Sequence, residues 1–134
     1  MVAVDRPSSI RLAEALYRAP EVEYIEADLA KDDLPEGPFD VAVMTDVYEH
    51  LEEEAGERLL GQIRERLSDF GLLVFSIPLA EGKDRNPRHV RTFKTAEDVL
   101  DEVGSHLAPG QAAVFIRIGS IAGQVKGTYQ PCAF

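Results

Sequence analysis

The sequence predicts an α/β protein whose mostly parallel sheet carries helices on both faces and ends in an antiparallel hairpin. Short β-prone runs alternate with stretches of helical periodicity, which is the order that βαβ units produce. The run 40–45 (DVAVMT) is mostly apolar, as in a strand buried at the centre of a parallel sheet. The last two strand-like segments are joined without a helix, which predicts the hairpin at the C-terminal edge.

The N-terminal part of the chain is typical of one βαβ unit. Residues 1–4 are β-prone, and Pro7 with the serines after it starts a helix over 9–18. Pro20 ends this helix, and residues 22–27 alternate apolar and polar side chains, which predicts a short strand near an edge. The apolar face of the helix consists of Ile10, Ala13, Leu16 and Tyr17.

A second helix and another strand follow the central run. Apolar residues recur at every fourth position and glutamates fill the first turn, which predicts a helix over 52–67. The recurring positions are Leu51, Ala55, Leu59, Ile63 and Leu67. Residues 72–78 (LLVFSIP) predict a buried strand that Pro78 stops.

The C-terminal part adds a helix and the hairpin. Thr95 with Asp98 resembles a capping box and starts a third helix. Residues 112–118 (AAVFIRI) and 128–134 are the two strand-like segments. The polar loop over 80–91 is long enough to carry function.

Composition narrows the classes of protein. A length of 134 residues fits one domain. The 24 acidic side chains outnumber the 14 basic ones, so we expect no nucleic acid partner. The chain has no apolar run of about 18 residues and no signal peptide pattern, so we expect a cytoplasmic protein without a membrane span. The single Cys132 has no disulfide partner and no nearby base in the sequence for nucleophilic catalysis.

Polar residues follow the predicted strands directly. Asp5 ends the first strand and Asp28 follows the second. Thr45 and Asp46 end the central run, and Glu49 with His50 come just after it. Open α/β sheets bind their ligands at the carboxyl ends of the strands, so we expect a site there.

The ordered segments VAVD, EADL, FDVAVMTDVYEHL, GLLVFSIP and HVRTF carry a resemblance. With this order and spacing the chain resembles the class I S-adenosylmethionine-dependent methyltransferases of the small-molecule group, from Val2 to about Ile118. The resemblance implies a Rossmann-like methyltransferase sheet, S-adenosyl-L-methionine as the cofactor and a small molecule as the methyl acceptor.

The resemblance also implies roles for single residues in cofactor binding. Asp5 would accept the ribose hydroxyls and Arg6 would pack on the adenine. Asp28 would take the adenine amino group, and the backbone amide of Leu29 would meet the ring. The strand end with Thr45 and Asp46 would lie alongside the methionine part of the cofactor.

A second set of residues matches the substrate side of the family's site. Glu49 and His50 match the family's "EH" pair at the mouth of the substrate site, with His50 a candidate base. His89 and Arg91 match the pattern His-x-Arg-x-Phe, which in related enzymes lies in a loop over the active site. We expect His50 and His89 to be catalytic, and Glu49 and Arg91 to bind the substrate.

One departure from the family affects the expected domain. The family's first strand and glycine-rich turn precede the strand that ends at Asp5, and this chain has no G-x-G motif. We therefore expect residues 1–134 to be a single methyltransferase domain that lacks this first strand through N-terminal truncation, with the activity of this form open. Self-association or a partner chain that fills the gap, or a different pairing of the strands, are the alternatives.

Structural interpretations compete with the functional ones. Asp28 would then be a solvated loop residue, Asp46 a helix cap and His50 a residue that fixes its corner by hydrogen bonds. Asp46, His50 and His89 offer possible metal ligands but lack metal-site spacing, so we expect no metal. The sequence also contains neither a G-x-S-x-G elbow nor a P-loop.

Two other function classes stay open at this point. A remnant or interaction domain could keep the sheet and bind no cofactor, which the absent glycine turn favours. A fragment of an NAD-dependent dehydrogenase could use Asp5 for a nicotinamide ribose, although the EHL corner and the C-terminal hairpin argue against it.

Overall fold

A computed structural model describes residues 1–79, 86–121 and 124–131, with side chains as far as Phe115. Cys132 therefore lies outside the described residues, as do residues 80–85 of the predicted loop over 80–91. The chain divides into two compact units, Met1–Pro35 and Glu36–Phe134. Each unit is described by itself, and the prediction of a single domain stays a prediction.

The first unit is the predicted βαβ unit. It contains β1 (Val2–Asp5), α1 (Pro7–Leu16) and β2 (Glu23–Glu26). The two strands pair in parallel, with Val2 opposite Glu23 and Asp5 opposite Glu26. Pro7 lies at the start of α1, where its missing N–H costs no hydrogen bond, so the helix begins two residues before the predicted start.

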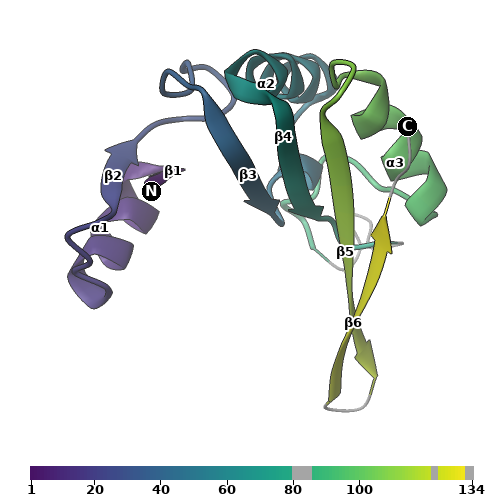
Figure 1. The fold of residues 1–134 in the computed structure, drawn as a ribbon. Coiled ribbons are helices and arrows are strands. Elements are labelled where there is room, and N and C mark those ends of the chain that lie inside the picture. Colours follow the sequence, from purple (N-terminus) through teal and green to yellow (C-terminus); the bar gives the residue numbers. More distant parts are fainter. Residues whose placement is uncertain (80–85, 122–123, 132–134) are drawn as a thin grey trace. The chain divides into compact units, whose positions relative to one another are not determined.

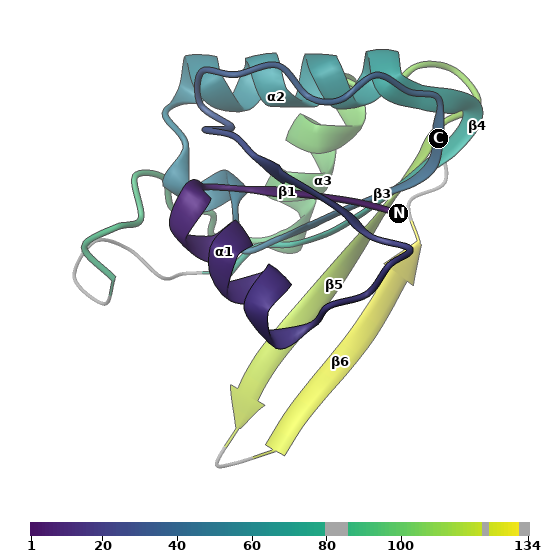
Figure 2. The same cartoon turned by 90° about the vertical axis from the view of Figure 1, so that its left-hand side faces the viewer.

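The second unit holds a four-stranded sheet in the order β3-β4-β5-β6 (Figure 1). Its strands are β3 (Phe39–Thr45), β4 (Leu67–Ser76), β5 (Ala112–Ile121) and β6 (Gln124–Pro131). The first three are parallel, and β5 pairs with β6 in an antiparallel ladder (Figure 2). The mostly parallel sheet with a C-terminal hairpin is confirmed, although β4 begins five residues before the predicted 72 and β6 begins at Gln124.

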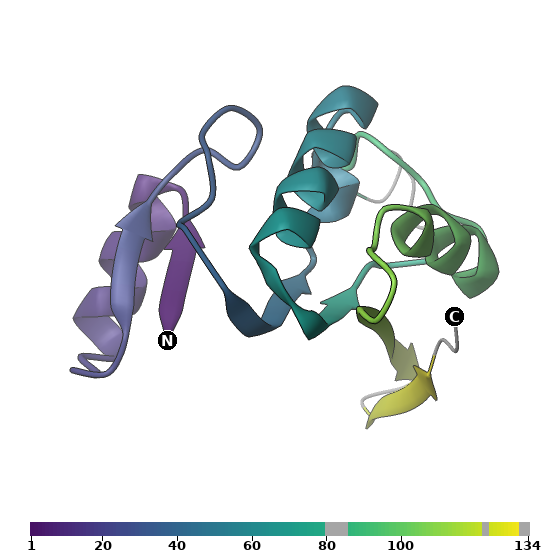
Figure 3. The ribbon, with the colours of Figure 1, turned by 45° about the horizontal axis from the view of Figure 1, so that its top comes forward.

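Two helices and one short turn of helix connect these strands. A 3₁₀ turn, η1 (Tyr48–His50), precedes α2 (Glu53–Arg66), and α3 (Ala96–Ser105) precedes β5. The strand order steps in one direction from β3 to β5, and right-handed crossovers then bring both helices to the same face. Figure 3 shows α2 and α3 on one side of this sheet. Helices on both faces stay a prediction, because α1 belongs to the other unit.

The core of the second unit lies between this face of the sheet and the two helices. The periodic residues Leu59 and Ile63 of α2 are buried as predicted, and the rings of Phe75 and Phe115 lie 5.3 Å apart between centroids. The predicted capping box also forms. The Thr95 hydroxyl accepts from the N–H of Asp98, and the Asp98 carboxylate accepts from the N–H of Thr95.

The predicted central position of residues 40–45 is wrong for the described sheet. Among the described strands, β3 pairs with β4 alone, and β1 pairs with β2 alone. On β3, Val41 and Val43 are 53% and 69% exposed, whereas Met44 is buried. An apolar run indicates a strand, but it does not indicate how many neighbours that strand has.

None of the helices in the described part of the chain combines the length and the apolar composition that crossing a bilayer requires.

Candidate functional site

The site in the second unit begins at the corner between β3 and η1. Asp46 follows β3 with a φ of 52°, in the left-handed region that aspartate tolerates better than most residues. Its backbone N–H donates to the Ser76 carbonyl, and its Oδ1 accepts from the Ser76 hydroxyl at 3.1 Å. Val47, and not Asp46, is the N-cap residue of η1, and no side chain caps this turn. Asp46 therefore binds the end of β4 instead of capping a helix.

A cavity of about 300 Å³ lies at this corner, at the carboxyl ends of β3 and β4. It brings together four predicted site residues, Asp46, Glu49, His50 and His89. It also brings in four residues that the sequence did not reveal, namely Ser76, Ile77, Pro78 and Asn86. Thr45 and Arg91 are not among its lining residues. The polar ends of two neighbouring parallel strands thus meet as the rule for open α/β sheets predicts.

Glu49 is the unusual member of this set. It is 1% exposed, and neither carboxylate oxygen has a hydrogen-bond partner in the part of the chain that the structure describes. Burial raises the pKa of the Glu49 carboxyl above its usual range. Its backbone carbonyl accepts from the N–H groups of Val90 and Arg91, which ties the predicted loop to the corner.

Two imidazoles lie beside the Glu49 carboxylate. Nε2 of His50 is 3.8 Å from Oε1 of Glu49, while Nδ1 of His50 lies 3.0 Å from the Arg88 carbonyl oxygen. The rings of His50 and His89 meet edge to face, with centroids 5.0 Å apart. His89 is 3% exposed, so the loop that carries it is packed against the corner at this residue.

Arg91 has other partners. Its guanidinium lies over the rings of Tyr48 and Phe93, at 4.9 and 5.0 Å from their centroids. Its Nη2 donates to Glu102 of α3 at 2.6 Å, and the same carboxylate oxygen accepts from the Tyr48 hydroxyl. Arg91 thus joins η1, the loop and α3. A role in substrate binding stays a prediction.

The remaining predicted residues lie in the first unit, at the carboxyl ends of β1 and β2. Asp5 is exposed, and its Oδ1 accepts from the Arg6 N–H at 2.6 Å. The hydrogen bond from the Ala30 N–H holds the pKa of the Asp28 carboxyl below its usual value, with help from Lys31. Arg6 contributes a smaller attraction to Asp28. Parallel pairing therefore brings the Asp5, Arg6, Asp28 and Leu29 set to one end of this unit.

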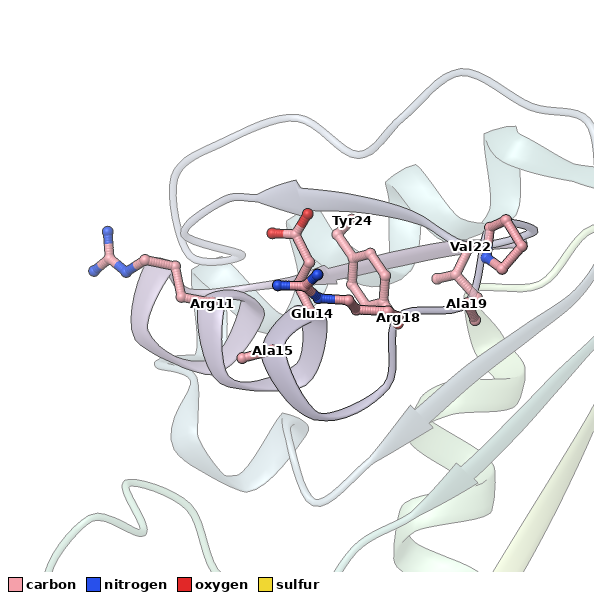
Figure 4. Close-up of a pocket in the computed structure, with 8 residues that line it drawn as sticks. Arg11, Glu14, Ala15, Arg18, Ala19, Val22 and Tyr24 are labelled. Carbon is pink, nitrogen blue, oxygen red and sulfur yellow. The ribbon is translucent and has the colours of Figure 1, made fainter.

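The same unit has a larger hollow of about 660 Å³ at the opposite end of β2. Figure 4 shows that its side chains come from α1, including Arg11 and Glu14, from Arg18 just after this helix, and from β2, including Tyr24. The Tyr24 hydroxyl donates to the Tyr17 carbonyl, which fixes one wall. None of the predicted cofactor residues lines this hollow, so its size does not make it the site.

One of the missed residues had a signal in the sequence. Ser76 is the polar residue that ends the strand beside β3, and the strand-end rule applies to it as much as to Asp46. Ile77 and Pro78 follow it as apolar neighbours, and Asn86 belongs to a loop whose path no periodicity predicts.

A family model described as a methyltransferase domain matches residues 1–106. The chain belongs to this methyltransferase family. Two curated proteins of Mycobacterium tuberculosis, MT3114 and Rv3030, are named probable S-adenosylmethionine-dependent methyltransferases. Each is 34% identical to this chain over 103 residues, which cover 72% of this chain and 36% of the relative. The chain thus spans little more than a third of the length of these relatives.

Solved structures support the fold. BH2331 of Bacillus halodurans C-125, assigned to the methyltransferases, gives a TM-score of 0.61 at 19% identity and covers 77% of this chain and 52% of its own. The pyocyanin biosynthetic protein PhzM gives a TM-score of 0.61 at 24% identity, and the match covers 98% of this chain and 42% of PhzM. The resemblance to class I methyltransferases and the Rossmann-like α/β fold are confirmed. The comparisons do not favour the dehydrogenase or the non-enzymatic alternative.

Proposed function

We propose that this methyltransferase chain catalyses methyl transfer from S-adenosyl-L-methionine to a small-molecule acceptor. The observation that carries the proposal is the gathering of Asp46, Glu49, His50 and His89 around one cavity at a strand-end corner, in a chain that belongs to the methyltransferase family. The names of the mycobacterial relatives support the choice of cofactor. A cytoplasmic location, the absence of a nucleic acid partner and association with a second chain remain predictions.

The acids of the first unit fit the hydrogen-bonding groups of the proposed cofactor. Ribose hydroxyls and an adenine amino group are donors, and an ionised carboxylate only accepts. The lowered pKa of Asp28 keeps its carboxylate ionised at neutral pH, and Asp5 has one oxygen beyond the one that Arg6 occupies. We propose Asp5, Arg6, Asp28, Leu29, Thr45 and Asp46 as cofactor-binding residues.

The cavity in the second unit would hold the acceptor. The sulfonium of S-adenosyl-L-methionine supplies an activated methyl group, so the protein has mainly to position the nucleophile and exclude water. We propose that His50 and His89 act on the nucleophilic atom of the acceptor, and that Glu49 and Arg91 shape its site. The volume of about 300 Å³ favours a small acceptor over a macromolecular one.

Calorimetric titration of the 134-residue chain with S-adenosylhomocysteine tests this function. We expect micromolar binding, about 8 kcal/mol, and no binding of NAD. Asp28→Asn should weaken binding about tenfold by removing a charged acceptor. Asp101→Asn is the matched control, because Asp101 is an exposed aspartate on α3 outside both sets of residues. A folded chain that binds NAD, or that does not bind S-adenosylhomocysteine, contradicts the proposal.

A further inference from the structure

The Glu49 carboxylate is buried without a hydrogen-bond partner in the described structure, and two imidazoles face it. An uncompensated buried carboxylate is costly, so a compensating group is expected at this position. From this arrangement we propose that Glu49, His50 and His89 form a binding site for a divalent transition-metal ion. No metal was expected from the sequence, because His89 lies 39 residues beyond His50 and no local spacing joins them.

The distances suit one ion shared by three side chains. One ligand atom from each residue can be chosen so that all three lie within 4.8 Å of one another. Oε1 of Glu49 and Nε2 of His50 are already 3.8 Å apart. Two ligands on a tetrahedral ion with bonds of about 2.1 Å lie roughly 3.4 Å apart. Small rotations of side chains around the cavity would therefore complete the coordination.

His50 is held in the tautomer that a ligand needs. Its Nδ1 lies 3.0 Å from the Arg88 carbonyl oxygen, which can only accept a hydrogen bond. Nδ1 therefore carries a proton, which leaves Nε2, the nitrogen on the Glu49 side, as the ligand atom of the neutral ring. A ligand histidine whose second ring nitrogen donates to a backbone carbonyl is a recurring support in metal sites.

His89 is coupled to Asn86 in a way that metal binding would change. Nε2 of His89 lies 2.8 Å from Nδ2 of Asn86, and Oδ1 of Asn86 accepts from the Arg88 N–H. The Arg88 N–H thus orients the amide so that Nδ2 donates to His89. Ligation through Nε2 would replace this neutral hydrogen bond, whose net contribution is small beside that of a metal bond.

The donor set indicates the class of ion. Two imidazoles and one carboxylate suit zinc, iron(II), cobalt or nickel, whereas magnesium and calcium prefer all-oxygen sites. Asp46 lines the same cavity and could supply a further oxygen. If the proposed function also holds, an ion here would lie where the nucleophilic oxygen or nitrogen of the acceptor is expected, and could activate it.

Cobalt(II) titration of the chelator-treated chain, without cofactor, tests the proposal through the visible absorption of the bound ion. We expect a saturable band with one ion per chain, which zinc abolishes by competition. Glu49→Gln and His50→Ala should each weaken binding on the order of 100-fold or more, beyond the usual loss for an outer-sphere residue. His50 tolerates substitution because its side chain is 35% exposed, and circular dichroism checks each variant for folding.

Glu57→Gln on α2 and His106→Ala after α3 are matched controls, since both residues lie outside the cavity and should leave binding unchanged. Absence of a band in the folded chain would overturn the proposal, as would equal affinity of Glu49→Gln and Glu57→Gln. Because the titration contains no cofactor, its failure is distinct from a failure to bind S-adenosylhomocysteine.

Discussion

Tyr48 and Glu102 are joined by a hydrogen bond of 2.5 Å between the phenol and the carboxylate, across 54 positions of the sequence. Tyr48 is fully buried, and the same carboxylate oxygen also accepts from Arg91. This pair therefore connects the turn beside the candidate site to α3. Hydrogen bonds to charged groups are stronger than neutral ones, so the connection can be measured by mutation.

Tyr48→Phe should lower the free energy of unfolding by about 1.5–3 kcal/mol, because it removes one bond to a charged acceptor. The ring and its stacking with Arg91 and Phe93 remain. Tyr17→Phe on the exposed end of α1 is the control and should change stability by less than about 0.5 kcal/mol. Urea denaturation measures both. Equal effects of the two substitutions would contradict the assigned role.

The same environment predicts a late ionisation of Tyr48. Burial first, and then the hydrogen bond to Glu102, raises the pKa of this phenol above its usual value. Because the folded pKa is raised, the stabilisation is complete below the unfolded pKa of about 10 and is lost as pH rises through the folded pKa. The difference in tyrosinate absorbance between wild type and Tyr48→Phe measures it. A difference that appears near pH 10 would contradict the prediction.

Two glycines of α2 should respond in opposite directions to alanine. A Cβ at Gly61 would meet nothing within 4 Å, whereas a Cβ at Gly56 would lie 2.8 Å from Cε2 of the Tyr48 ring. Alanine favours a helix interior over glycine by roughly 0.8–1 kcal/mol, so Gly61→Ala should stabilise the protein by up to that amount. Gly56→Ala should destabilise it by about 1–3 kcal/mol through overpacking.

Thermal unfolding of the two variants provides the comparison, and each is the control for the other because both changes occur in one helix. The melting temperature should rise for Gly61→Ala and fall for Gly56→Ala. A rise in both would mean that helix propensity outweighs packing at this corner, and that Tyr48 can move away.

Sequence patterns predicted most of the fold because its helices and strands are locally encoded. The four-residue repeat of α2 became the buried face with Leu59 and Ile63, and the Thr95 capping box formed as expected. Strand neighbours were harder to predict, since pairing depends on contacts far apart in the chain. The exposed Val43 of β3 illustrates this, because its apolar character alone suggested a central strand.

The candidate site, like the fold, was predictable only where its residues are positioned by local sequence. Asp46, Glu49 and His50 could be selected because they follow a strand directly, where α/β sheets bind ligands. Their partners could not be selected, because Asn86 and the Arg88 carbonyl reach the corner through an irregular loop. The ion pair between Arg91 and Glu102 could not be predicted either, since the two residues belong to different elements.

Asp46 provides a test of the corner itself. At a φ of 52° a Cβ is unfavourable by roughly 1–2 kcal/mol, whereas glycine adopts this conformation freely. Asp46→Ala should lose both the hydrogen bond from Ser76 and the tolerance of aspartate for this conformation. Asp46→Gly should lose the hydrogen bond alone, so the glycine variant should be more stable than the alanine variant by about 1 kcal/mol.

Asp101 in the interior of α3 gives the control with the opposite sign, since alanine there should be more stable than glycine by roughly 1 kcal/mol. Ser76→Ala removes the same hydrogen bond without altering the backbone. If Asp46→Gly loses only this bond, the two variants should lose the same free energy of unfolding. Urea denaturation of the five variants measures these orders. If alanine were the more stable substitution at position 46 as well, the left-handed backbone would not be a constraint on the corner that holds Glu49 and His50.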